Sequence, residues 1–340
     1  MLSTRFTSRF DLKYPIALAP MDPASGGRLA AAVSNAGALG LLGGGYGSHE
    51  TLQKEFDLAG DAAIGCGFIT WSMGKDVSLL EKAIERRPRA LMLSFSDPEP
   101  FARKITDAGI PLICQVQTLD HVQRAVDCGA TAIVAQGTEA GGHGFDRQTT
   151  MTFTPEVADY LAATSPVTLL LSAGGIADGR GLAAALMLGA DGVLMGTRFW
   201  ATQEALIHQK AKDLVVRAKG GQTVRTSVFD IARGRQWPEE YTGRLMVNDF
   251  IRKWHGREDA LKAVWREEKV RVESAYESGD YDCANVTVGQ AIGLVADLPP
   301  AASVVQRVAG QAERLLHSRN VASLLEGPVT ERSMGAALTS

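Results

Sequence analysis

The sequence predicts an α/β protein, a (β/α)8 TIM barrel with a helical insertion after the eighth strand. Over the first 200 residues, eight short apolar runs alternate with amphipathic helical stretches. The runs are apolar throughout and do not alternate with polar residues, which is typical of parallel strands covered on both faces. Eight such units favour a closed barrel over an open, doubly wound sheet, and 340 residues suit a barrel of roughly 250 plus an insertion.

The eight expected strands each end in a turn marked by glycine or proline. They are residues 15–19, 38–42, 62–68, 90–95, 111–116, 130–135, 167–172 and 192–195. The helical stretches between them, several of which begin at a capping residue such as Ser48, Thr118 or Asp178, are residues 27–35, 48–57, 77–86, 100–108, 118–128, 155–163 and 179–188.

After Phe199 the pattern changes. Residues 200–280 are rich in charge and carry apolar residues at helical spacing, for example in 203–218, 258–265 and 267–278, and no further βα unit is visible. Pro299 and Pro300 precede a last helix at 302–316. We therefore expect residues 1–200 and 285–325 to form the barrel, and residues 201–284 to form a helical insertion near the active site.

The composition excludes several classes of partner. The formal net charge is -3 and 21% of residues are charged, so there is no basic excess for nucleic acid or an anionic membrane. No run of 18 or more apolar residues is free of both charge and glycine clusters, and residues 1–11 lack the apolar core of a signal peptide. We expect a cytoplasmic protein with no nucleic-acid or membrane partner.

Four cysteines, Cys66, Cys114, Cys128 and Cys283, lack the spacing of a zinc site or a redox pair. Cys66 and Cys114 lie in apolar, strand-like runs, which predicts buried free thiols. No cluster of histidine, cysteine and acidic residues has metal-ligand spacing, so no metal site is expected.

Two glycine turns follow the last two expected strands. The seventh strand runs into SAGGIADG at 172–179, and the eighth runs into LMGTR at 194–198. Glycines let backbone amides approach an anion, and a helix N-terminus adds a favourable dipole. Either turn alone could bind nothing, but the pair at successive strand ends predicts a phosphate site. Its candidate residues are Ser172, Gly174, Gly175, Leu194, Met195, Gly196 and Thr197.

Four segments carry a family resemblance. The segment SAGGIADGRGLAAALMLGADGVLMGT at 172–197 resembles the FMN-phosphate segment of the nitronate monooxygenase family, formerly called 2-nitropropane dioxygenases. So do PIALAPM at 15–21, NAGALG at 35–40 and ATAIVAQGTEAGGH at 130–143. The 172–197 segment alone is shared with other FMN barrels, such as the inosine-monophosphate dehydrogenase group and enoyl reductases. The AQGTEAGGH segment narrows the choice.

The resemblance implies FMN as cofactor and assigns roles by position. Ala19, Pro20 and Met21 would lie against the flavin ring, while Gln136 and the glycines Gly141 and Gly142 would contact the cofactor. The two glycine turns would hold its phosphate. Gly67 stands where the family commonly has an asparagine, and Gln115 stands where some relatives have lysine. An acidic residue and a proline, Asp22 and Pro23, follow the PIALAPM segment on the expected substrate side.

The resemblance also implies that His143 is the catalytic base. A nitroalkane must lose an α-proton before its carbon can reduce flavin, and a side chain that titrates near neutrality suits that step. A nitronate arrives deprotonated, so His143 would then only hydrogen-bond the nitro oxygens. Trp71 and Met73, beyond the third strand, either wall the substrate cavity or pack in the core.

Three functions remain open on the sequence. The leading one is an FMN-dependent monooxygenase that uses O2 to convert a small molecule, an alkyl nitronate or nitroalkane, to a carbonyl compound and nitrite. The second is an NAD(P)H-dependent reductase of quinones or enoyl thioesters on the same barrel. The third is a barrel that binds a phosphorylated metabolite without redox chemistry. The sequence leaves the physiological substrate, the electron donor and the oligomeric state open, a homodimer being one option.

Overall fold

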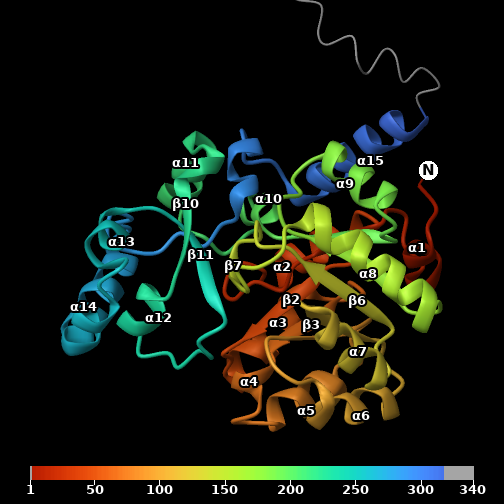
Figure 1. Cartoon of the computed structure of the whole chain (residues 1–340), viewed down its shortest axis with the longest axis horizontal. Coiled ribbons are helices and arrows are strands. Elements are labelled where there is room, and N and C mark those ends of the chain that lie inside the picture. Colours follow the sequence, from red (N-terminus) through yellow and green to blue (C-terminus); the bar gives the residue numbers. More distant parts are fainter. Residues whose placement is uncertain (1, 318–340) are drawn as a thin grey trace, which may run out of the picture.

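The structure, a computed structural model, describes residues 2–317 and closes eight parallel strands into a barrel (Figure 1). The strands are β1 (Ile16–Leu18), β2 (Leu41–Gly45), β3 (Gly65–Ile69), β4 (Leu91–Ser94), β5 (Leu112–Val116), β6 (Ala132–Gln136), β8 (Leu169–Ala173) and β9 (Gly192–Met195). Their order is β1-β9-β8-β6-β5-β4-β3-β2. The Leu18 amide donates to the Leu39 carbonyl at 2.9 Å, which closes the ring between β1 and the start of β2. The predicted α/β barrel is confirmed, and every strand overlaps an expected one.

Helices cover the outside of the barrel. They are α2 (Gly27–Asn35), α3 (His49–Ala59), α4 (Thr70–Met73), α5 (Ser78–Glu85), α6 (Glu99–Asp107), α7 (Leu119–Asp127), α8 (Thr150–Thr164), α9 (Gly179–Met187), α10 (Thr197–Trp200) and α15 (Ala301–His317). Ser48, Thr118 and Asp178 cap α3, α7 and α9 with their side chains, as expected. The last helix, α15, packs beside α9 and returns the chain to the barrel (Figure 1).

The strands separate two apolar layers. One set of side chains fills the barrel interior, including Leu41, Met92, Ile113, Val134, Leu171 and Leu194. The alternate set packs outward against the helices. Because side chains of a strand alternate between its faces, Gly67, Gln115 and Gln136 face the interior at the carboxyl ends of β3, β5 and β6. The barrel therefore presents two glutamines and a glycine at its mouth.

A helix that the sequence analysis did not anticipate, α1 (Arg5–Phe10), closes the opposite end of the barrel. Phe6 and Phe10 join the interior cluster with 0% and 3% of their surface exposed. Arg5 donates two hydrogen bonds of 2.7 Å to the carboxylate of Asp191, which directly precedes β9. This ion pair fixes α1 beneath the strands.

The segment between α10 and α15 lies beside the barrel (Figure 1) and is not wholly helical, so that expectation was wrong. It contains α11 (Gln209–Arg217), η1 (Gly220–Gln222), α12 (Val228–Ala232), α13 (Asp249–Trp254), α14 (Glu258–Ser278) and η2 (Gln290–Leu294), but also β10 (Thr223–Thr226) and β11 (Thr242–Met246). These strands form an antiparallel sheet with β7 (Gly142–Gly144). Both strands are short and carry a buried arginine, so neither has an apolar strand pattern.

Other sequence expectations can be compared directly. Helix α14 has a non-helical residue, Val264, close to the boundary between the two expected helices. Cys66 and Cys114 are buried free thiols, and burial raises the pKa of both. In residues 2–317 no group of histidine, cysteine and acidic side chains could hold a metal ion, and no helix there is long and apolar enough to cross a membrane. Residues 318–325 of the expected barrel range lie outside the described residues.

The plug formed by α1 leads to a stability prediction. Phe6→Ala removes a fully buried ring from the barrel interior and is expected to lower the free energy of unfolding by about 3–5 kcal/mol. Chemical denaturation measures it, with Met187→Ala, on a side chain that is 80% exposed, as the control. Equal unfolding midpoints for the two variants would show that α1 does not support the barrel.

Candidate active site

The loops after β8 and β9 leave the barrel side by side, because Ala173 pairs with Leu194 in the sheet. Gly174 and Gly175 have φ angles of +111° and +72°, a region that favours glycine. A Cβ on Gly174 would lie 2.7 Å from Thr150 Oγ1 and 3.2 Å from the amide nitrogen of Ala140. The glycine turn is thus pressed against the loop that follows β6.

The end of β1 meets the loop after β9. The Ala19 amide donates to the Met195 carbonyl at 3.0 Å, and a Cβ on Gly196 would lie 3.3 Å from Met21 Sδ. On the other side, a Cβ on Gly67 would lie 2.3 Å from Pro20 Cγ. The departure at Gly67 from the family pattern therefore has a structural counterpart, since the ring of Pro20 fills the space that a side chain there would need.

Residues 288–289 join two of the expected cofactor loops. Thr197 Oγ1 accepts a hydrogen bond of 2.8 Å from the Gly289 amide. A Cβ on Gly141 would lie 2.5 Å from the same nitrogen, and the neighbouring Gly142 has a φ of +73°. The loops after β6 and β9 are therefore packed together through Gly289.

Two of the predicted residues turn their side chains away from these loops. The hydroxyl of Ser172 is fully buried between β8 and α8 and lies 2.7 Å from Thr154 Oγ1. Leu194 points into the barrel interior. Only the backbones of these residues are available at the mouth.

The N-terminus of α9 is also occupied. Asp178 accepts hydrogen bonds from the amides of Arg180 and Gly181, and the Gly179 amide donates to Gln311 Oε1. These amides cannot also serve a phosphate, so the contribution expected from this helix end is missing. The glycine turn before the helix keeps its own amides.

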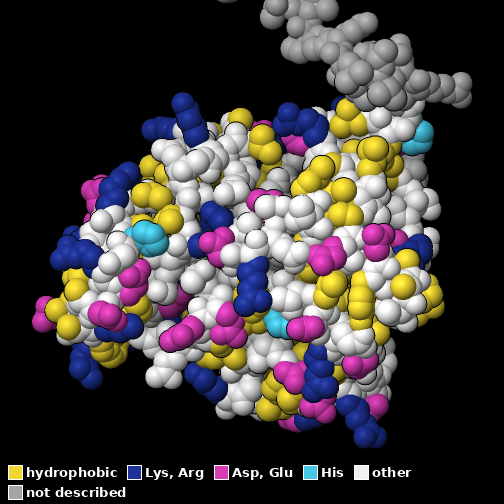
Figure 2. All heavy atoms as spheres, in the orientation of Figure 1, with side chains coloured by type: hydrophobic (Ala, Val, Ile, Leu, Met, Phe, Trp, Pro, Cys, Tyr) yellow, Lys and Arg dark blue, Asp and Glu magenta, His cyan; other side chains and the backbone are white. Residues whose placement is uncertain are grey.

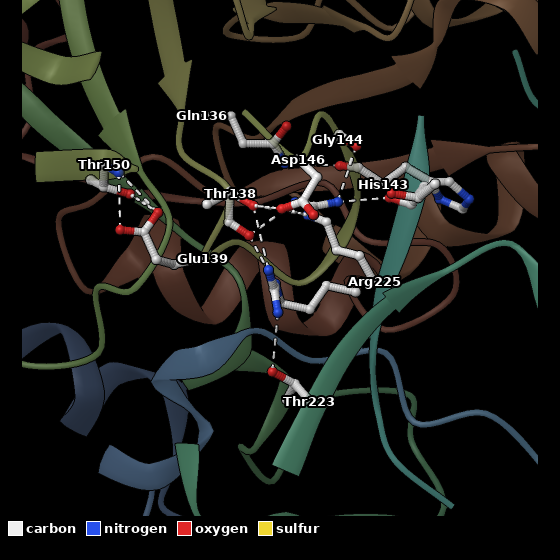
Figure 3. Close-up of polar contacts among 11 residues, drawn as sticks. Gln136, Thr138, Glu139, His143, Gly144, Asp146, Thr150, Thr223 and Arg225 are labelled. Atoms are coloured by element: carbon white, nitrogen blue, oxygen red, sulfur yellow. Dashed lines mark hydrogen bonds and ion pairs between the residues drawn. The ribbon is translucent and has the colours of Figure 1, made fainter. Parts of the chain in front are cut away.

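Gln136 links the barrel mouth to the histidine loop. Its Oε1 accepts hydrogen bonds from Gln117 Nε2 at 2.7 Å and Gln115 Nε2 at 3.1 Å. Its Nε2 donates to the backbone carbonyl of His143 at 3.0 Å (Figure 3). The amide of Gln136 is thereby fixed at the mouth of the barrel.

His143 itself faces the insertion. Its Nε2 lies 2.9 Å from Asp230 Oδ2, and both side chains are largely buried. The indole of Trp237 stacks on the imidazole with ring centroids 3.5 Å apart and planes 5° apart. Phe95 approaches the imidazole edge-on at 6.4 Å. Sequence reasoning missed Asp230 and Trp237, since they lie far along the chain from His143 in a segment without a motif.

An aromatic cluster extends from Trp237. Its Nε1 donates to the Tyr46 hydroxyl at 2.7 Å, and Trp71 meets both rings edge-on. Trp71 Nε1 is buried and has no hydrogen-bond partner within residues 2–317. Of the two residues left open on the sequence, Trp71 therefore lies beside the site, whereas Met73 packs in the core with 1% exposure.

Two buried arginines fasten the insertion to the loop after β6 (Figure 3). Arg225 donates to the carbonyls of Gly144, Thr242 and Thr138, and Arg244 donates to the carbonyl of Thr138. Burial, reinforced by the charge of Arg244, lowers the pKa of Arg225 to about 10, which leaves it charged near neutral pH.

Glu139 secures the other side of the same loop, because its carboxylate accepts hydrogen bonds from the amide and hydroxyl of Thr150 (Figure 3). This geometry fits the orienting role considered for Glu139 and does not direct the carboxylate at His143.

A cavity of about 340 Å³ lies beside Gln115. Its lining includes Asp97, Arg124, His121 and Tyr241, and burial lowers the pKa of His121. The volume is near the lower end of small-molecule sites. On the face drawn in Figure 2, basic and acidic side chains are intermixed over the surface.

Comparisons with known proteins agree with this geometry. The family model for nitronate monooxygenase matches residues 3–63 and 68–310. The nitronate monooxygenase npaC of Metarhizium robertsii is 35% identical, covering 90% of this chain and 93% of its own. The nitronate monooxygenase of Neurospora crassa is 31% identical, covering 88% and 90%.

Solved structures share the fold. FabK from Thermotoga maritima superimposes with a TM-score of 0.82 at 28% identity, covering 96% of this chain and 99% of FabK. Nitroalkane oxidase from Streptomyces ansochromogenes has a TM-score of 0.75 at 24% identity, covering 92% and 98%.

The closed barrel, its converging glycine loops and the histidine on an inserted sheet define a TIM-barrel flavoprotein of the oxidoreductase class. Within that class, the chain belongs to the nitronate monooxygenase family.

The docking of the insertion can be tested at Arg225. Arg225→Met leaves the buried carbonyls of Gly144 and Thr242 without this donor, and we expect a loss of about 2–4 kcal/mol in stability. Amide hydrogen exchange should quicken first in β7, β10 and β11. Arg252→Met, on a side chain that is 65% exposed, is the control. Unchanged exchange in these strands would mean that the arginine does not hold the insertion.

Proposed function

We propose that this chain is an FMN-dependent nitronate monooxygenase that oxidises alkyl nitronates or nitroalkanes with O2 to a carbonyl compound and nitrite. The observation that carries the proposal is the placement of His143, tied through Gln136 to the mouth of a flavoprotein barrel and hydrogen-bonded to a carboxylate. Relatives at 35% and 31% identity carry the name of this activity.

The residues at the mouth fit a flavin mononucleotide. The Gly174 and Gly175 turn has the backbone conformation that lets amides approach a phosphate, and it neighbours the loop that contains Gly196 and Thr197. The segment Ala19–Met21 and the Gln115–Gln136 pair would meet the ring, with Gly141 and Gly142 at its edge. When bound, FMN would supply the redox chemistry, taking electrons from the substrate and passing them to O2.

His143 would act on the substrate's proton. A neutral nitroalkane gives up its α-proton to the imidazole, and the electron pair of the C–H bond remains on the substrate as the nitronate. With a nitronate as substrate this step is absent. The aromatic rings of Trp237 and Phe95 shield the imidazole from water on the sides that they cover.

Two aerobic assays, run side by side, test the function. We expect nitrite release from an alkyl nitronate without consumption of NAD(P)H. Consumption of NAD(P)H with a quinone or enoyl thioester, and no nitrite from nitronate, would instead support the reductase. A protein that stays colourless after FMN is added would support a phosphometabolite-binding barrel.

Substitution of the proposed base gives a sharper result. His143→Ala should retain FMN and lose turnover of a neutral nitroalkane by roughly 10²–10⁴-fold, the usual contribution of a general base. Flavin absorbance and nitrite release measure the two effects separately. Turnover equal to that of the unaltered protein would remove His143 from the catalytic role.

The phosphate turn is tested by Gly174→Ala, which places a methyl group 2.7 Å from Thr150 Oγ1 at a φ of +111°. We expect at least about tenfold weaker FMN binding, about 1.4 kcal/mol, because the turn must shift. The matched control is Gly109→Ala, at a φ of +72° with nothing within 4 Å of the added carbon. If both variants bind FMN equally well, the turn does not hold the cofactor.

A further inference from the structure

The two ring nitrogens of His143 have different surroundings. Nε2 lies 2.9 Å from Oδ2 of Asp230, whose side chain is 12% exposed. An ionised carboxylate only accepts hydrogen bonds, so a neutral imidazole in this contact carries its proton on Nε2. The lone pair is then on Nδ1.

The imidazole is also held against rotation. The parallel indole of Trp237, at 3.5 Å between centroids, covers one face of the ring. Trp237 is fixed in turn by its hydrogen bond to the Tyr46 hydroxyl. A half-turn of the imidazole would break the contact with Asp230 and slide the ring against a fixed neighbour.

The backbone on both sides of this contact is anchored. His143 lies in β7 and pairs with Gly243 of β11, while its carbonyl accepts from Gln136. Asp230 lies in α12 of the insertion, and its backbone carbonyl accepts from the Arg235 amide at 2.9 Å, just before Trp237. The carboxylate and the stacking indole thus belong to one short stretch of the insertion.

We propose that Asp230 is a positioning residue that holds His143 in the Nε2–H tautomer and thereby makes Nδ1 the atom that accepts the substrate's α-proton. The inference rests on the proposed function, in which His143 deprotonates a neutral nitroalkane. The C–H bond breaks, its electron pair stays on the substrate as the nitronate, and the proton joins Nδ1. Asp230 stabilises the imidazolium that results without taking its proton.

The tautomer can be read without turnover. Nitrogen-15 NMR of the FMN-saturated protein with labelled histidine distinguishes a protonated from an unprotonated ring nitrogen, and the spectrum of His143→Gln identifies the His143 signals. We expect the proton on Nε2. In Asp230→Asn the amide can either accept from or donate to Nε2, so both tautomers should be populated. A wild-type ring with its proton on Nδ1 overturns the proposal.

Kinetics provide the second reading. In Asp230→Asn, kcat for a neutral nitroalkane should fall at least about tenfold with little change in KM, while oxidation of the preformed nitronate changes much less. Asp230→Glu should recover part of kcat. Asp259→Asn, on a side chain that is 97% exposed, is the control and should match the unaltered protein.

The outcomes separate the two levels of the account. If Asp230→Asn shifts the tautomer and leaves kcat for the neutral nitroalkane unchanged, Asp230 does not position the base and the proposal is wrong. If the unaltered protein oxidises no nitroalkane at all, the proposed function fails, and the NMR spectrum still decides which nitrogen carries the proton.

Discussion

The pairing of β7 with β11, locked by the guanidinium groups of Arg225 and Arg244, is the constraint on which the candidate site depends. Burying two cations beside each other is costly, and the cost is offset because backbone carbonyls of the β6 loop and of β11 accept their hydrogen bonds. The loop from 137 to 144 can therefore adopt one conformation, in which Gln136 stays at the barrel mouth and His143 faces the insertion. The insertion is thereby part of the active site.

The barrel could be predicted from the sequence because its strands are apolar on both faces and its helices have an amphipathic period. The smaller sheet could not. In β7 the residues are Gly, His and Gly, and in β10 and β11 the buried side chains include Arg225 and Arg244. An arginine in a short polar strand is typical of a solvent-facing position, and only its carbonyl partners, distant in sequence, explain its burial. Helix α1 was missed because two phenylalanines among polar residues are too few to define a period.

The candidate site was partly predictable for the same physical reason. Glycine turns at successive strand ends are local features, and the structure brings them together as neighbouring loops. Asp230 reaches His143 across 87 residues, and a contact of that kind leaves no periodic signal in a single sequence. The orientation of Ser172 was available: it stands between Leu171 and Ala173, which both face the interior, so strand alternation turns its hydroxyl outward.

The central claim is that the loops after β8 and β9 hold the phosphate of a flavin mononucleotide. It is tested most directly by titrating the flavin-free protein with FMN and with riboflavin, which lacks the phosphate, and following flavin absorbance and fluorescence. The account predicts that FMN binds and that riboflavin binds at least roughly hundredfold more weakly, since hydrogen bonds to a charged group contribute about 1.5–3 kcal/mol each. Equal affinity for the two flavins, or no binding of either, would contradict it.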